Sequence, residues 1–95
     1  MSPVAATRVR AVVSGRVQGV GFRYYCRNAA VRAGLSGWVR NRGDGTVELE
    51  AQGEQEQVET FLKQVRQGPP LSRVTNVNRR EMPVDRGSRG FEITY

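Results

Sequence analysis

The clearest hydrophobic pattern in the chain lies between residues 54 and 67, where apolar residues recur at i, i+3, i+4 and i+7. This spacing predicts an amphipathic helix, and the Gly-Pro-Pro sequence at 68–70 ends it. A second helix of about three turns is predicted over residues 22–33, with Gly34 as its terminator. The apolar residues that define the two helices are Val58, Phe61, Leu62 and Val65, and Phe22, Cys26, Ala29, Ala30 and Ala33.

The remaining apolar stretches are short and β-branched or alternate with polar residues, as strands do. The sequence Arg-Gly-Asp-Gly at 42–45 is typical of a hairpin turn between two of them. Val74 and Val77 are out of step for simple alternation, which indicates a bulged strand, and the Arg- and Gly-rich segment 82–90 is predicted to be a loop. The predicted strands are 9–14, 36–42, 46–52, 71–80 and 91–95, the last running to the end of the chain.

The resulting order, β-α-β-β-α-β plus a C-terminal strand, predicts an α+β fold. It is the ferredoxin-like two-layer sandwich, with two helices on one face of an antiparallel sheet. In this topology the strands 9–14 and 36–42 run parallel with the third strand between them, so their C-terminal ends lie about 10 Å apart at one edge. We expect a single domain over residues 1–95, with residues 1–7 flexible, because the chain is below the size at which domains divide.

Composition limits the chemistry that this fold can carry. The chain has no histidine and one cysteine, which excludes histidine-based triads, zinc cages and disulfide frameworks. Fourteen arginines and one lysine give a net charge of +6, which favours anionic partners, although arginine excess can equally reflect the base composition of a genome. No apolar run approaches 18 residues and residues 1–8 do not resemble a leader, so we expect a cytoplasmic, reduced protein without a membrane partner.

A glycine-punctuated segment, residues 14–23, joins the first predicted strand to the first helix. Glycines there let the backbone curl so that N–H groups point inward, and the helix N-terminus adds partial positive charge. Arg23 in the first helical turn is unfavourable for the helix dipole unless an anion offsets it. The segment therefore indicates an anion cradle, although its glycine spacing is neither a Walker A sequence nor a dinucleotide fingerprint, and the glycines could merely serve a tight connection.

Asn41 ends the second predicted strand, and the sheet topology aims it at the same spot as the glycine segment. Asn is a common turn former, which is the simpler interpretation. A neutral amide can also orient a water molecule without repelling or neutralising a phosphate.

Two stretches closely resemble the signatures of the acylphosphatase family: Val13-Ser14-Gly15-Arg16-Val17-Gln18-Gly19-Val20-Gly21-Phe22-Arg23, and Gly37-Trp38-Val39-Arg40-Asn41 followed by Asp44-Gly45. The resemblance continues through Val47-Glu48 and Gly53 to Gly90-Phe91-Glu92. It implies a small hydrolase that converts an acyl phosphate and water into a carboxylate and inorganic phosphate, with no metal or cofactor. By the same resemblance, Arg23 binds the phosphoryl oxygens and Asn41 positions the attacking water. The implied cradle is the backbone of Gly15, Arg16, Val17, Gln18, Gly19 and Val20.

The residues available suit this chemistry. Phosphoryl transfer depends on positioning and on stabilisation of the equatorial oxygens, which a cradle and an arginine can supply. The leaving carboxylate has a conjugate-acid pKa of about 4, so it needs no general acid. Neither motif offers a base, and we hypothesise that the substrate phosphate deprotonates the water. Loss of activity on replacing Glu48, Glu50 or Asp44 would contradict this hypothesis.

Other functions are each suggested by a single feature of the sequence. Cys26 and Arg32 have the spacing of cysteine-dependent phosphatases, but no glycine lies between them and Cys26 falls on the apolar stripe, which predicts a core residue. An RNA-binding module of RRM-like topology would suit a basic chain, but its aromatic motif is echoed only in the last strand. We therefore expect no nucleic-acid partner.

A third possibility is the acylphosphatase-like domain that opens larger carbamoyl-transfer proteins, which continue into cysteine clusters. This chain stops at residue 95, so we expect a free-standing enzyme. It gives no oligomeric signal beyond the absence of a heptad or an exposed apolar run, so we expect a monomer.

Overall fold

A computed structural model describes residues 6–95 of the chain. The order of elements matches the sequence prediction, with two helices among five strands. Of the segment 1–7 that was expected to be flexible, residues 1–5 lie outside the described part, and Ala6 and Thr7 belong to the first strand. The elements are β1 (Ala6–Arg16), α1 (Phe22–Arg32), β2 (Ser36–Asn41), β3 (Val47–Glu54), α2 (Gln55–Gln67), β4 (Arg73–Met82) and β5 (Phe91–Ile93).

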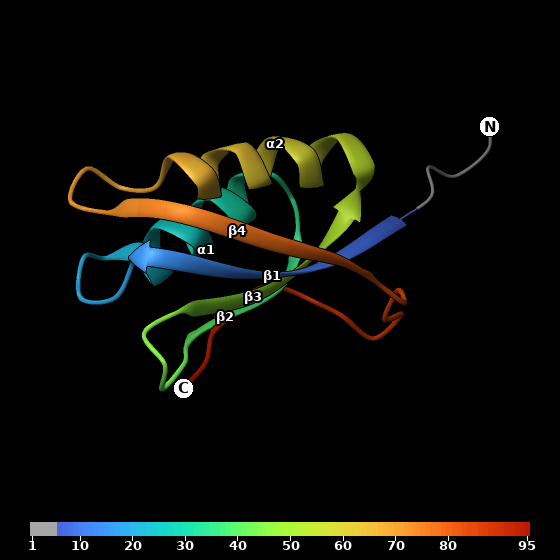
Figure 1. Ribbon diagram of the computed structural model, residues 1–95. Coiled ribbons are helices and arrows are strands. Elements are labelled where there is room, and N and C mark those ends of the chain that lie inside the picture. The colour runs from blue at the N-terminus through green and yellow to red at the C-terminus, as the bar shows by residue number, and fades with distance from the viewer. Residues whose placement is uncertain (1–5) are drawn as a thin grey trace.

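The strands form one sheet in the order β4-β1-β3-β2-β5, and both helices cover the same face of it (Figure 1). β3 lies antiparallel between β1 and β2, so β1 and β2 run in the same direction, as the topology predicted. Their C-terminal ends therefore meet at one edge of the sheet. This ferredoxin-like sandwich places the loop after β1 and the hairpin after β2 at the same end of the molecule (Figure 1).

The C-terminal part of the chain differs from the prediction in two details. β5 pairs with β2 in parallel, so the sheet is mixed and only its other four strands are antiparallel. The last strand also ends at Ile93 and does not reach the end of the chain, although the Thr94 N–H still donates to the Val39 carbonyl at 2.8 Å. The predicted bulge is present, as a register shift between Ser14 and Gly15 where β1 meets β4.

The core lies between the sheet and the helices and is made of the residues that the periodicity singled out. In α2 the buried residues are those at i, i+3, i+4 and i+7, and in α1 they are Phe22, Cys26, Ala29 and Ala30. The Cys26 side chain is fully buried, which confirms its prediction as a core residue. Burial raises the pKa of its thiol well above the ordinary range, so it is not available as a thiolate nucleophile.

The opposite face of the sheet carries a group of ion pairs, which we call the sheet-face network. The Glu48 carboxylate binds Arg10 and Arg40 with nitrogen–oxygen distances of 2.5 and 2.7 Å. Arg8 binds Glu50 at 2.8 Å, and its guanidinium also donates to the side chains of Gln52 and Ser88. Arg40 faces Glu48 directly across β2 and β3, whereas the pairs from β1 are diagonal neighbours.

Candidate active site

A small pocket of about 110 Å³ lies where the C-terminal ends of β1 and β2 meet the N-terminus of α1. This volume exceeds the roughly 10–15 Å³ that one water needs, so the pocket has room for a small ligand. We call it the edge pocket. Its lining residues are Val17, Gly19, Gly21, Phe22, Arg23, Tyr24 and Asn41.

The glycine segment forms one wall of the edge pocket. Gly19 and Gly21 have φ angles of 74° and 78°, in the left-handed region that favours glycine. Gly21 is also the residue that precedes α1, and no side chain caps the free N–H groups of this helix end. Backbone donors and the positive end of the helix dipole are thus concentrated at one wall, as an anion requires.

The six residues predicted to form the cradle fall into two groups. Val17 and Gly19 line the edge pocket, with Gln18 and Val20 beside them in the same loop. Gly15 and Arg16 are instead the last residues of β1, where they pair with β4.

A glycine is required at position 15 because β4 lies close to β1 there. Its φ angle is 117°, and a Cβ atom there would meet the Arg73 carbonyl oxygen and the Thr75 nitrogen at less than 3 Å. The bulge at this point lies on β4, where the extra residue Thr75 stands opposite Ser14 and Gly15. Gly15 therefore lets β1 approach β4 closely just before the loop begins.

The Gln18 side chain has a role that the sequence analysis did not assign. Its amide nitrogen donates to the carbonyl oxygens of Arg42 and Thr46 at 2.8 and 2.9 Å. Both acceptors belong to the hairpin between β2 and β3, so the amide joins the glycine loop to the segment that follows Asn41. No pattern in the sequence reveals this link, because it depends on the distance between two loops.

Arg23 reaches the edge pocket from the first turn of α1. Its guanidinium lies 5.1 Å from the ring centroid of Tyr95, within the range of a cation–π contact. Among residues 6–95, no carboxylate lies within ion-pair distance of Arg23, and the first turn of α1 contains no acidic residue. The positive charge of Arg23 is therefore left for a ligand.

Asn41, the last residue of β2, brings its amide to the same pocket. Its Oδ1 atom is buried and has no hydrogen-bond partner in residues 6–95. Buried polar atoms in proteins are nearly always satisfied, so an unsatisfied one in a pocket indicates a role toward a ligand or a water. The structure thus brings together Arg23, Asn41 and part of the predicted glycine cradle.

The acidic residues considered as bases do not line the edge pocket. Glu48 and Glu50 belong to the sheet-face network, and Asp44 accepts hydrogen bonds from the backbone N–H and hydroxyl of Thr46. Burial raises the pKa of Glu48, but hydrogen bonds from Arg40 and Arg10 outweigh burial and hold it below its ordinary value. A carboxylate held by two arginines is a weak base.

The two tyrosines after Arg23 have different surroundings. The Tyr25 hydroxyl donates to the Gln64 carbonyl at 2.8 Å and so ties α1 to α2. Burial raises the pKa of the Tyr25 hydroxyl, and repulsion from Cys26 raises it further. Tyr24 lines the edge pocket and is 54% exposed. Tyr25 is therefore a structural residue, whereas Tyr24 stands at the rim of the pocket.

The chain is similar to known proteins in both sequence and fold. The family model described as Acylphosphatase matches residues 9–93. The chain belongs to the acylphosphatase family. The acylphosphatase of Bacillus pumilus is 52% identical over 83 residues, which are 87% of this chain and 92% of the relative. The crystal structure of the acylphosphatase of Bacillus subtilis has a TM-score of 0.90 at 42% identity and covers 94% of this chain and 99% of that one.

Acylphosphatase-like structure also occurs inside longer proteins. A crystal structure of full-length HypF in the phosphate- and nucleotide-bound form matches with a TM-score of 0.86 and 28% identity, covering 99% of this chain but 12% of that one. None of these comparisons supports the RRM-like alternative. No helix in residues 6–95 is long and apolar enough to cross a membrane.

Proposed function

We propose that this member of the acylphosphatase family hydrolyses acyl phosphates at the edge pocket, with Arg23 and Asn41 as its catalytic residues. Arg23 binds the phosphoryl oxygens, and the loop from Gly15 to Val20 supplies the backbone cradle. Asn41 orients the attacking water. The observation that carries the proposal is the buried, unsatisfied Asn41 Oδ1 in the same pocket as an arginine without a carboxylate partner.

In the proposed reaction, the water oxygen forms a bond to phosphorus as the bond from phosphorus to the acyl oxygen breaks. The electron pair of that bond leaves with the carboxylate. The products are the carboxylate and inorganic phosphate. Arg23 and the α1 N-terminus stabilise the charge on the equatorial oxygens, which is the main requirement of phosphoryl transfer. The Asn41 Oδ1 accepts a hydrogen bond from the water and so aligns it with phosphorus.

We propose further that the base is the substrate phosphate itself, which takes the proton of the attacking water. The arrangement of the carboxylates supports this, because Asp44, Glu48 and Glu50 are each engaged with another side chain and none lines the edge pocket. Separate Asp44→Asn, Glu48→Gln and Glu50→Gln variants are expected to keep kcat within about threefold. A hundredfold loss in a variant that still folds would identify that residue as the base.

The test of the proposed activity is hydrolysis of benzoyl phosphate, followed by its ultraviolet absorbance in excess chelator. Asn41→Ala is expected to lower kcat about a hundredfold or more, because the water loses its alignment. Inhibition by inorganic phosphate is expected to change less than threefold, because the cradle and Arg23 remain. Asn28→Ala, an exposed amide on α1 outside the pocket, is the matched control and should leave both values unchanged.

The proposal fails if the wild-type protein does not hydrolyse benzoyl phosphate above background. It also fails if Asn41→Ala weakens phosphate inhibition as much as turnover, since Asn41 would then bind phosphate and not water. We further infer a monomer that works in the cytoplasm without nucleic-acid or membrane partners. Size-exclusion chromatography with light scattering tests the first part, and a dimer mass at micromolar concentration would contradict it.

A further inference from the structure

Arg27 lies one helical turn beyond Arg23 and has no role in the site described above. The two residues are four positions apart on α1, a spacing that puts side chains on the same side of a helix. Arg27 is half-buried, and within residues 6–95 no carboxylate lies within ion-pair distance of it. A cation held in this way beside an anion site is available to a second anionic group.

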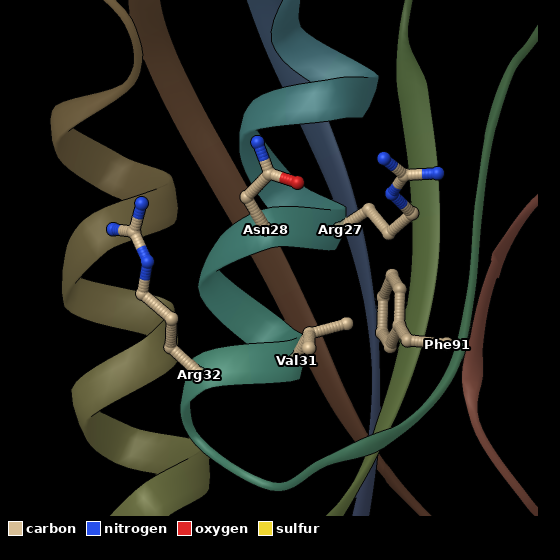
Figure 2. A pocket seen from close by; sticks show the side chains of 5 residues that line it. All are labelled: Arg27, Asn28, Val31, Arg32 and Phe91. Carbon is tan, nitrogen blue, oxygen red and sulfur yellow. The ribbon is translucent and has the colours of Figure 1, made fainter.

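The Arg27 guanidinium is held close to the edge pocket by an aromatic ring. It lies 5.5 Å from the ring centroid of Tyr24, and Tyr24 lines that pocket. In Figure 2 the Arg27 side chain extends sideways from α1 toward Phe91, and its guanidinium turns toward the N-terminal end of the helix, which borders the edge pocket. Arg27 also lines an open hollow of about 450 Å³, so its side chain is accessible.

The charges around Tyr95, the aromatic residue that Arg23 contacts, are arranged differently. A hollow lined by Tyr95 also contains Arg40 and Glu48. Glu48 binds Arg40 at a nitrogen–oxygen distance of 2.7 Å, and the same carboxylate also binds Arg10. An acyl group that leaves the pocket past Tyr24 therefore meets a cation with no carboxylate partner, whereas the cation beside Tyr95 is already bound to a carboxylate.

We propose that Arg27 binds a second negative charge on the acyl group, so that the preferred substrates are acyl phosphates of dicarboxylic or otherwise anionic acids. This inference rests on the proposed function, because it needs the phosphoryl group in the edge pocket. Tyr24 fixes the guanidinium at the rim and gives the acyl group an aromatic surface. Arg27 acts on substrate selection and not on the reacting bond.

The experiment compares benzoyl phosphate with 4-carboxybenzoyl phosphate, which differs only by a rigid carboxylate that cannot fold back onto the acyl carbon. We expect wild type to prefer the carboxylated substrate about fivefold in kcat/KM, the size typical of a partly exposed charge contact. Arg27→Gln should remove this preference and leave benzoyl phosphate turnover unchanged. The preference should also weaken at 1 M salt, where the screening length falls to about 3 Å.

Arg32→Gln is the matched control, since it removes the same charge from the same helix. Arg32 is exposed and lines the same open hollow, but in Figure 2 its side chain leaves α1 in the direction opposite to that of Arg27. This variant should keep the preference of wild type. Equal preference in wild type and Arg27→Gln, or an equal loss in Arg32→Gln, would overturn the proposal.

A binding measurement separates failure of this proposal from failure of the proposed function. Benzylphosphonate and 4-(phosphonomethyl)benzoate are used as inhibitors, since neither can be hydrolysed. Arg27→Gln should weaken inhibition by the carboxylated compound only. If wild type hydrolyses benzoyl phosphate but does not distinguish the two inhibitors, the Arg27 subsite is wrong and the proposed function stands. If benzoyl phosphate is not hydrolysed, the proposed function is wrong and the subsite with it.

Discussion

The arginines of the sheet-face network differ from Arg23 and Arg27 of α1 in whether a carboxylate binds them. Arg8, Arg10 and Arg40 each bind a carboxylate at 2.5–2.8 Å in the sheet-face network. Arg23 and Arg27 have no such partner among residues 6–95, and each lies against an aromatic ring instead. An aromatic ring holds a guanidinium in place without neutralising its charge.

This difference shows that a high arginine content has two separate uses in one small fold. On the sheet, arginine–carboxylate pairs cover a face that no helix packs against. On α1, positive charge is kept uncompensated where an anion is expected. Net charge alone does not distinguish the two, but the partner of each guanidinium does. We therefore expect an arginine-to-glutamine substitution to lower activity on α1 and stability on the sheet.

The largest effect is expected for Arg23→Gln. Removal of the guanidinium should lower kcat/KM for benzoyl phosphate about a thousandfold and abolish phosphate inhibition, because the charge that meets the phosphoryl oxygens is lost. The melting temperature should change by less than about 2 °C, since Arg23 has no carboxylate to leave unpaired. Steady-state kinetics measures kcat/KM and calorimetry measures the melting temperature, both on the same preparation.

Arg8→Gln makes the same chemical change on the sheet. We expect it to lower stability and to leave activity nearly unchanged. It leaves the Glu50 carboxylate, 17% exposed, without its cation, which we expect to destabilise the fold by about 2 kcal/mol. Urea unfolding measures this value, and kcat should stay within twofold of wild type. The two regions are not separate if Arg8→Gln lowers activity as much as Arg23→Gln does. The same holds if Arg23→Gln lowers stability as much as Arg8→Gln does.

A smaller effect, about 1–2 kcal/mol, is expected for Glu48→Gln, because Arg10 and Arg40 keep contact with water when they lose their partner. The folded-state pKa of Glu48 is lowered, so its contribution to stability is present above the unfolded pKa and is lost as pH falls through the folded value. The stability difference between wild type and Glu48→Gln should therefore shrink below about pH 4.5. Urea unfolding at pH 7, 4 and 3 tests this, and a constant difference would contradict it.

The smallest effect is expected at Gln18, in the loop between β1 and α1. Gln18→Ala removes two hydrogen bonds to the hairpin carbonyls of Arg42 and Thr46, which should lower stability by about 1 kcal/mol. The loop should also hold phosphate less well, so KM is expected to rise a few-fold with little change in kcat. Gln57→Ala, an exposed glutamine in α2, is the control. A fall in kcat with unchanged KM would assign Gln18 a different role.

Local patterns predicted most of the fold. The i, i+3, i+4, i+7 spacing of Val58, Phe61, Leu62 and Val65 identified both α2 and its buried face. The position of Asn41 at a strand end, together with the topology, predicted that it would approach the glycine segment, and both line the edge pocket. These features depend on neighbours in the chain or on the order of elements, which the sequence contains directly.

Other features depend on distances that no local pattern contains. The Gln18 side chain meets carbonyls 24 and 28 residues away. The diagonal pairs Arg8–Glu50 and Arg10–Glu48 require the register and twist of β1 on β3, and a shift of one residue would separate them. The parallel pairing of β5 with β2 likewise follows from the path of the 83–90 loop and not from the alternation of residues 91–95.

The two hydrogen bonds between Gln18 and the hairpin also link ligand binding to folding. Because the edge pocket is built from the loop after β1 and the end of β2, it is absent from an unfolded chain. A ligand that binds only the folded form stabilises it by mass action, by about 1.4 kcal/mol at ten times its dissociation constant. Inorganic phosphate would then protect the whole sheet from unfolding, and above the dissociation constant each tenfold increase in phosphate would add about 1.4 kcal/mol. Thermal denaturation in a phosphate series would thus report the occupancy of the site without any turnover.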